Sequence, residues 1–477
     1  MAEQHQPERV QWLPATDRRG FLRMGAALAG GILVSPRGRD SAHEWALARP
    51  RPTAAQLLWQ QDEVALFVHF GVNTFTDREW GDGREDPAVF APTALDARQW
   101  ARAARAAGAR AMILTAKHHD GFCLWPTATT EHSVRRSPWR NGDGDVVREF
   151  VDACRAEGLR PGLYLSPWDR NNPVYGDSPR YNNLFEAQLT ELCTRYGALS
   201  EIWFDGANGE GPNGKRQTYD WKRFWDACHR LQPEAVVFSS AGPDVRWCGN
   251  EQGTAGDPNW STMDPLAIPE PGGQFEAGKE GLLQHGDPNG SVWRPAEINT
   301  SIRPGWFYHA AEDARVRTVD DLVSLYFNSV GRNGKLLLNV PPTPAGLFPE
   351  VDVARMADWR VRLSALFATD LAGNARATWR RTGARTAELD VVLRRPATVG
   401  LARIGEDIRS HGQLVAKHSV YGQVGSEWRL LAGGSTIGYA RLHRFPPASV
   451  GAVRVVIEEA VDAPERVDLA LYAGGAA

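Results

Sequence analysis

A carboxylate at the end of a short apolar stretch is the first feature of this sequence that could do chemistry. Ile202, Trp203 and Phe204 form the stretch, Asp205 follows directly, and Gly206 lets the chain turn away. In a parallel α/β protein, an acid at this point faces the substrate site above the sheet. A turn or a helix N-cap is the common alternative for an Asp-Gly pair. The residues at the ends of the other apolar stretches must therefore show whether Asp205 belongs to a substrate site.

Histidine, tryptophan, arginine and carboxylate side chains follow four further apolar stretches at the same relative position. If these stretches are neighbouring parallel strands, the side chains gather at one edge of the sheet. Imidazoles and carboxylates bond hydroxyl groups, and tryptophan faces stack on the apolar face of a sugar ring, so the set suits a carbohydrate. The residues concerned are His69, Glu79, Trp80, His118, His119, Trp168, Arg246 and Glu251.

A pair of carboxylates would allow this site to cleave a glycosidic bond. Two carboxyl groups about 5–5.5 Å apart across a glycosidic bond cleave it with retention, one as nucleophile and the other as acid and then base. The two need different environments, so that one is ionised and the other protonated near neutral pH. Asp205, short and held at a strand end, suits the nucleophile. Its partner is Glu251 or Glu297, and the residues alone leave this choice open.

Metal-assisted hydrolysis and sugar binding without catalysis are the two alternatives. His69, His118, His119 and Asp205 could in principle ligate zinc at a barrel mouth. However, neighbouring residues of an extended chain point to opposite sides, which separates the two adjacent histidines unless the backbone turns there. An inactive binding protein would have lost a carboxylate, and both candidates are present. We therefore expect an enzyme that needs no metal and no cofactor.

The elements that must position these residues follow an α/β pattern. Seven apolar runs alternate with helical periodicity, which predicts a parallel sheet buried on both faces and, in particular, a (β/α)8-like barrel with one unit irregular or missing. A doubly wound open sheet is the alternative, but no Gly-rich phosphate turn follows any run. The runs span 65–70, 111–116, 161–166, 201–205, 235–240, 296–302 and 335–340, and the helices are expected at 96–107, 145–157, 181–196, 219–231, 319–330 and 353–367.

Two segments depart from this alternation. Residues 250–291 are rich in Gly and Pro and form a long excursion between two barrel units, and loops of this length are usually functional or disordered. From about residue 377 the pattern is alternating β over roughly a hundred residues, which predicts a sandwich. We therefore assign residues 49–370 to the catalytic barrel and 371–477 to a C-terminal β-sandwich.

The N-terminus has the pattern of a twin-arginine signal. Arg18 and Arg19 precede an apolar run at 24–34, which is too short to span a bilayer but fits a signal peptide. Residues 1–48 are thus expected to be a signal peptide and a disordered segment. The expectation is export of the folded protein, to the periplasm or out of the cell, with no membrane attachment once the signal is removed.

The amino-acid composition limits the kinds of molecule that the protein is expected to bind. The net charge of −3 and the 23% of charged residues show no basic field for nucleic acid. The 18 Trp residues favour a carbohydrate protein, and the five Cys have neither zinc-site nor disulfide spacing. These totals leave the oligomeric state open.

Five motifs together resemble the α-L-fucosidases of glycoside hydrolase family 29. They are HFGVNTFTDREWGDG, AKHHDGFCLWPT, LYLSPWDRN, EIWFDGANG and SIRPGWFYH, and the resemblance runs from about residue 56 to 358. It implies a retaining exo-glycosidase on a (β/α)8-like barrel that releases fucose from a fucosylated oligosaccharide or glycoconjugate. Its nucleophile would be Asp205, its acid/base Glu251 in the stretch VRWCGNE, and its sugar contacts His69, Glu79, Trp80, His118, His119, Tyr164, Trp203 and Arg246.

Two finer resemblances concern specificity and the C-terminus. DREWGDG, SPWDRN and VRWCGNE together look like the branch of the family that acts on α-1,3 and α-1,4 fucosyl branches of Lewis-type glycans. The stretches GEDIRSHGQLVAKHSVYGQV and GSTIGYARLHRFPP are similar to discoidin-like, galactose-binding-like sandwiches. For that domain, support of the barrel is the favoured role, with sugar binding as the alternative.

Overall fold

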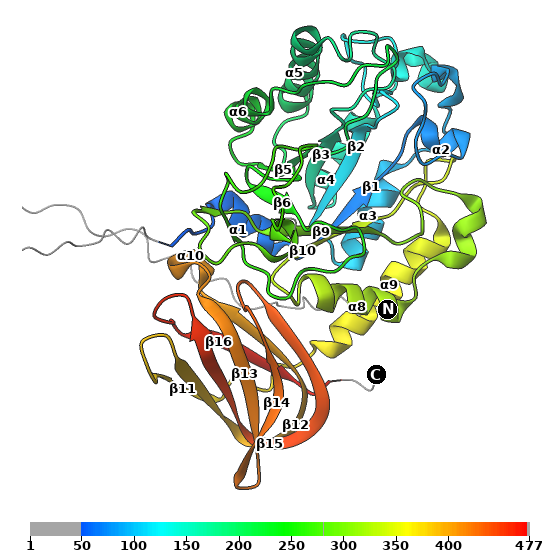
Figure 1. The fold of residues 1–477 in the computed structure, drawn as a ribbon. Helices are drawn as coiled ribbons and strands as arrows, with labels where there is room; N and C mark the ends of the chain where they lie inside the picture. Colours follow the sequence, from blue (N-terminus) through cyan, green and yellow to red (C-terminus); the bar gives the residue numbers. More distant parts are fainter. Residues whose placement is uncertain (1–48, 280, 475–477) are drawn as a thin grey trace, which may run out of the picture. The chain divides into compact units, whose positions relative to one another are not determined.

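Eight parallel strands close into a barrel in the computed structural model, which describes residues 49–279 and 281–474 (Figure 1). The strands are β1 (Val64–Val68), β2 (Ala111–Lys117), β3 (Arg160–Leu165), β4 (Glu201–Trp203), β5 (Val236–Ser239), β6 (Val245–Trp247), β9 (Ala296–Ser301) and β10 (Lys335–Asn339). Neighbours follow the order β1-β10-β9-β6-β5-β4-β3-β2, which confirms the prediction of a barrel. Every residue of β1, β2 and β10 is buried, as expected for strands covered on both faces. The predicted signal peptide lies outside the described residues.

The short strand β6 explains why only seven apolar runs are visible in the sequence. It has three residues, and its central one is Arg246, so it carries no apolar run. It follows β5 after a tight turn rather than after a helix, and it pairs with β5 on one side and β9 on the other. The irregular unit of the barrel therefore lies between β5 and β9.

Several of the helices begin at a residue whose side chain bonds a free backbone amide. They are α1 (Ala54–Gln61), α2 (Val72–Thr76), α3 (Ala97–Ala107), α4 (Val146–Ala156), α5 (Ser178–Arg195), α6 (Trp221–Leu231), α7 (Leu282–His285), α8 (Val319–Ser329), α9 (Glu350–Leu366) and α10 (Ile408–His411). The carboxylate of Asp96 accepts from two amides at the start of α3, and α3 stops at Gly108, whose φ of 90° glycine adopts without strain. Across residues 49–279 and 281–474, each helix is too short or too polar to cross a membrane.

The Gly- and Pro-rich excursion carries structure of its own beside the barrel. Between β6 and β9 the chain forms α7 and a small antiparallel sheet of β7 (Thr262–Met263) and β8 (Val292–Trp293). Met263, Ile268 and Leu283 pack into one apolar cluster with Ala241, which follows β5. The excursion is therefore anchored close to the carboxyl ends of β5 and β6.

The C-terminal domain is an antiparallel β structure with two long strands. Its strands are β11 (Arg376–Arg381), β12 (Ala387–Glu406), β13 (Val415–Val424), β14 (Glu427–Gly434), β15 (Arg441–Ala460) and β16 (Val467–Tyr472). The first half of β12 pairs with β11, its second half pairs with β16, and register shifts lie between the halves. Side chains of both halves enter one apolar core, so the sheet folds over on itself, as predicted for a sandwich.

Candidate active site

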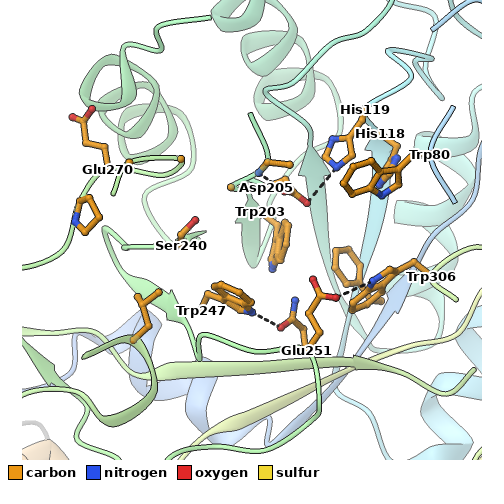
Figure 2. A pocket seen from close by; sticks show the side chains of 18 of the residues that line it. Trp80, His118, His119, Trp203, Asp205, Ser240, Trp247, Glu251, Glu270 and Trp306 are labelled. Atoms are coloured by element: carbon orange, nitrogen blue, oxygen red, sulfur yellow. Dashed lines mark hydrogen bonds and ion pairs between the residues drawn. The ribbon is translucent and has the colours of Figure 1, made fainter. Parts of the chain in front are cut away.

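A cavity of about 500 Å³ opens at the carboxyl ends of the barrel strands (Figure 2). This is the end at which parallel barrels place their substrate sites, and the volume is in the range that holds small ligands. Strand ends supply one side, and the excursion supplies the other. The lining includes Phe67, His69, Glu79, Trp80, His118, His119, Trp203, Asp205, Ser240, Trp247, Glu251, Ile268, Pro269, Glu270, Phe275, Asn299 and Trp306.

Asp205 is held in one position directly after β4. The amide of Ala207 donates to its Oδ1 at 2.7 Å, and the hydroxyl of Tyr164 donates to its Oδ2 at 3.1 Å. Both hydrogen bonds hold the carboxylate in one orientation. The side chain is 25% exposed, so it remains accessible from the cavity. A carboxylate that is fixed and accessible suits the role of a nucleophile.

Three histidines face the cavity in the neutral form. Burial lowers the pKa of His69 to about 3 and that of His118 well below its ordinary value. Burial also lowers the pKa of His119, although the charge of Asp205 acts in the opposite direction. The chain turns directly after β2, where the amide of Gly121 bonds the carbonyl of His118, so both adjacent rings reach the cavity. Neutral imidazoles can accept as well as donate hydrogen bonds to sugar hydroxyls.

The same histidines are not arranged as metal ligands. Among the described residues, no three His, Cys, Asp or Glu side chains are close enough together to hold a metal ion. Nδ1 of His69 is 2.8 Å from the side-chain oxygen of Asn339, and Nδ1 of His119 is 2.7 Å from the hydroxyl of Ser166. Each ring is therefore bonded through one nitrogen and has only Nε2 left for a ligand.

Trp203 forms the floor of the cavity. Its ring lies between Phe238, at 4.2 Å and nearly parallel, and Tyr164, at 5.0 Å. Its indole nitrogen donates to Glu297 Oε1 at 2.9 Å. Glu297 is fully buried below this floor, where burial and the neighbouring Glu201 hold its pKa well above the ordinary value. Of the two glutamates considered as acid/base, the structure places Glu251 in the cavity and Glu297 beneath it.

Glu251 reaches the cavity from the segment after β6. Its Oε2 accepts a hydrogen bond of 3.3 Å from the indole of Trp306 (Figure 2). Partial burial raises the pKa of Glu251, and the charges of Asp205 and Glu79 raise it further, while the indole hydrogen bond acts in the opposite direction. The site thus contains one carboxylate that accepts two hydrogen bonds and one whose pKa is raised, and an acid and a nucleophile need such different environments.

Glu79 fixes the loop that carries Trp306. Its carboxylate accepts from the backbone amides of Trp306, at 2.8 Å, and Phe307, at 3.0 Å. The ring of His309 adds a third hydrogen bond at 2.8 Å. Glu79 also lines the cavity, beside Trp80, whose ring stands edge-on to His119. The predicted acidic and tryptophan pair therefore joins the wall of the site to the loop after β9.

Tyr164, a predicted sugar contact, is fully buried and does not line the cavity, although it bonds Asp205. Arg246, another predicted sugar contact, also lies outside the cavity lining. Its side chain is fully buried and bonds the carbonyl oxygens of Leu283 and Arg294 and the side chain of Asn259. Burial lowers its pKa to about 9. The predicted sugar contact is thus replaced by a structural role, in which Arg246 ties β6 to the excursion.

Several lining residues escaped the sequence analysis. Trp247 follows Arg246 directly in the sequence and was not predicted as a site residue, but it lines the cavity and its indole nitrogen donates to Asn299 at 2.9 Å. Trp306 lay in a quoted motif without an assigned role. The excursion residues, such as Ile268 and Phe275, carry no periodic signal and come to the site only through tertiary packing.

A closed parallel barrel with two carboxylates in an aromatic-lined cavity at its carboxyl end defines a glycoside hydrolase. Residues 39–360 match the profile of the Alpha-L-fucosidase family, and the chain belongs to that family. The resemblance found in the motifs is thereby confirmed.

Known relatives agree with this assignment. Alpha-L-fucosidase 1 of Arabidopsis thaliana is 46% identical over 330 residues, which cover 68% of this chain and 63% of the plant protein. A glycoside hydrolase 29 family member from an unknown rumen bacterium is 40% identical with a TM-score of 0.82, covering 90% of this chain and 78% of the other. A GH29 fucosidase of Ruminococcus gnavus, solved in complex with fucose, is 29% identical with a TM-score of 0.80, covering 89% and 95%.

Proposed function

We propose that this chain is a retaining exo-α-L-fucosidase in which Asp205 is the nucleophile and Glu251 the acid/base. The observation that carries the proposal is the difference between their environments within one cavity. Asp205 is held directly after β4 by two hydrogen bonds, whereas partial burial and the neighbouring charges raise the pKa of Glu251. A double displacement needs this division of roles.

The reaction follows from these positions. Asp205 attacks the anomeric carbon and forms a glycosyl ester, while Glu251 gives its proton to the leaving glycosidic oxygen. The ionised Glu251 then takes a proton from water, which attacks the ester and releases fucose and the free Asp205 carboxylate. Tyr164, which already bonds Asp205, holds its carboxylate in place during both steps.

The test compares three glutamates of similar chemistry. On an aryl fucoside with a good leaving group, we expect azide to rescue Glu251→Ala by forming a fucosyl azide of retained configuration. Glu270→Ala is the matched control, because Glu270 lines the same cavity without an assigned role. Rescue in Glu297→Ala instead would transfer the acid/base role to Glu297.

The nucleophile has its own variant. We expect Asp205→Ala to fold with the wild-type denaturation midpoint and to lose activity by about 10³-fold or more. Near-normal turnover of the aryl fucoside by this variant would exclude Asp205 as nucleophile.

For the natural substrate we propose α-1,3- or α-1,4-linked fucosyl branches of Lewis-type glycans. Three motifs support this branch, DREWGDG, SPWDRN and VRWCGNE. Initial rates on a Lewis-type trisaccharide and on an aryl fucoside would test this choice of substrate. Higher kcat/KM on the trisaccharide is the expected result, and efficient cleavage of the aryl fucoside with inert trisaccharide would contradict it.

We also propose export through the twin-arginine route. Arg18 and Arg19 with the apolar run at 24–34 support it. All five cysteines are free and buried, which suits a protein that folds before it is moved. In a bacterial host, changing both arginines to lysine is expected to leave the enzyme inside the cell, with Arg9→Lys as the matched control. Unchanged export of the double variant would contradict the route.

A further inference from the structure

Two of the cavity histidines end hydrogen-bond chains that start at backbone carbonyls. The first chain runs from Trp306 through Asn339 to His69. The side-chain nitrogen of Asn339 is 2.8 Å from the carbonyl oxygen of Trp306, and its side-chain oxygen is 2.8 Å from His69 Nδ1. The second runs from Trp168 through Ser166 to His119, with distances of 2.7 Å at both steps.

The first chain fixes a proton position. A backbone carbonyl can only accept, so the amide nitrogen of Asn339 must face Trp306. The same nitrogen is 3.0 Å from Ser301 Oγ, whose own proton goes to the carbonyl of Gly305 at 2.7 Å. The oxygen of Asn339 therefore faces His69, and the imidazole must donate from Nδ1.

The second chain leads to the same result. A serine hydroxyl has one proton, and that of Ser166 is directed to the carbonyl of Trp168. The contact between Ser166 and His119 then needs a proton from the ring, at Nδ1. Both histidines are neutral because burial lowers their pKa values, so Nε2 carries no proton in either ring.

We propose that Asn339 and Ser166 are positioning residues that hold His69 and His119 as Nδ1–H tautomers and present two Nε2 lone pairs to the substrate. The site then selects ligands whose hydroxyl groups donate at both points. This specificity rests on the proposed function, since it takes the ligand to be a fucosyl group in this cavity.

The same tautomer keeps Nε2 of His119 free beside the nucleophile. His119 Nε2 lies 3.9 Å from Asp205 Oδ2 (Figure 2). An Nε2–H tautomer could close this gap and donate to the carboxylate, and Nε2 would then be unable to accept from a substrate hydroxyl group. Ser166 prevents this by keeping the proton on the far side of the ring. Tyr164 remains as the side-chain donor at that oxygen.

The direct test is the tautomeric state of the unliganded enzyme. Nitrogen-15 NMR of ring-labelled histidine distinguishes protonated from unprotonated ring nitrogens, and His69→Gln and His119→Gln assign the signals. At neutral pH we expect an unprotonated Nε2 and a protonated Nδ1 in both rings. A protonated Nε2 in either ring would overturn the proposal. Because no turnover is involved, this outcome is independent of whether the enzyme cleaves fucosides.

Ser166→Ala tests the positioning role. We expect His119 alone to change to a mixture of tautomers, and kcat/KM to fall about tenfold, as for the loss of one hydrogen bond. Ser329→Ala is the matched control, because this buried serine also bonds a carbonyl, that of Leu325, away from the site. A variant with an unchanged His119 spectrum would contradict the role of Ser166.

Fluorinated analogues test whether the hydroxyl groups of the ligand donate hydrogen bonds to the two Nε2 atoms. Fluorine cannot donate a hydrogen bond, so at two ring positions deoxyfluorofucose should inhibit no better than the corresponding deoxyfucose. Tighter inhibition by the fluorinated analogue at every position would show that the site donates throughout and would overturn the proposal. Failure of fucose itself to inhibit, with the predicted tautomers intact, would instead count against the proposed function.

Discussion

The indole of Trp203 donates to Glu297 at 2.9 Å and thereby connects the floor of the cavity to a buried charged cluster at the other end of the barrel. Lys335 lies 3.0 Å from Glu201 and 4.0 Å from Glu297. Lys335 and Glu201 are the first residues of β10 and β4, and Glu297 is the second residue of β9. The orientation of a substrate-facing ring thus depends on groups that never meet the substrate.

Replacing Glu297 should separate structural from catalytic effects. Burial and Glu201 hold the pKa of Glu297 well above its ordinary value, and Glu297→Gln replaces the carboxyl group by a nearly isosteric amide. We expect this variant to keep kcat/KM within about threefold, since it still accepts from Trp203. Glu297→Ala leaves the indole unpaired beside a cavity and should lower the free energy of unfolding by about 2–5 kcal/mol. Urea denaturation measures the free energy of unfolding, and aryl fucoside kinetics measure kcat/KM. A Glu297→Ala variant as stable as the wild type would show that the hydrogen bond from Trp203 does not stabilise the fold.

The same carboxyl group gives the wild type a pH-dependent stability. Because its pKa is higher in the folded than in the unfolded state, the folded protein binds the extra proton, and stability falls as pH rises above the ordinary glutamate value of 4.5. We expect the stability of Glu297→Gln to decline less over the same range. Parallel slopes for the two proteins, measured by urea unfolding at several pH values, would show that the carboxyl group does not bind this proton.

The basic limb of the activity profile should belong to Glu251. The acid must be protonated, so activity is present below its pKa and is lost as pH rises through it. Partial burial raises that pKa from 4.5, which moves the limb upward. In Glu251→Gln, assayed on a substrate whose leaving group needs no proton, the basic limb should disappear from kcat/KM. A limb that persists unchanged in this variant would point to another group.

The location of the residues at the strand ends was predictable, because all strands of a parallel barrel end at the same edge of the sheet. Asp205 and the adjacent His118 and His119 follow apolar runs, so their position in the sequence already places them at the carboxyl edge of the sheet. Tyr164 came from a motif rather than from a pattern and was predicted to contact the sugar, but the structure buries it and its hydroxyl group bonds Asp205 instead. This part of the site needed only local sequence and topology.

The remainder depended on tertiary packing that no local pattern encodes. Arg246 was predicted to touch sugar, but in a three-residue strand its side chain points into the excursion, where carbonyl oxygens surround it. Phe275 reaches the cavity only because Ile268 and Leu283 anchor the excursion against the barrel. The choice between Glu251 and Glu297 likewise needed the position of Trp203, which separates them.

His309 should make the Trp306 loop sensitive to pH without touching the substrate. Although burial acts in the opposite direction, hydrogen bonds to Asp77 and Glu79 raise the pKa of His309 above 6.5. Its contribution is therefore fully present below 6.5 and is lost as pH rises through the higher folded value. We expect His309→Ala to raise KM a few-fold at pH 6 and less at pH 9, where the wild type has also lost the ion pair. An equal effect at both pH values would contradict this origin.

Glu63 should couple the C-terminal domain to the stability of the barrel. Its carboxylate accepts from Arg403 on β12 at 2.7 Å, from Tyr439 at 3.0 Å, and from Tyr326 on α8 at 2.6 Å. Burial alone would raise its pKa, but the charge of Arg403 and these hydrogen bonds hold it below the ordinary 4.5. This group therefore stabilises the fold above pH 4.5, and the contribution is lost as pH falls through the lower folded value.

Glu63→Gln would leave Arg403 without its charged partner, and breaking a buried pair costs about 3–5 kcal/mol. We expect a loss of this size in urea denaturation at pH 7 and a smaller difference from wild type below the folded pKa of Glu63, where the wild-type carboxyl group is also neutral. Glu427→Gln is the control, because its pair with Arg429 lies exposed on β14 and should leave the midpoint unchanged. If the two variants unfold at the same urea concentration, the contact between Glu63 and Arg403 does not support the barrel.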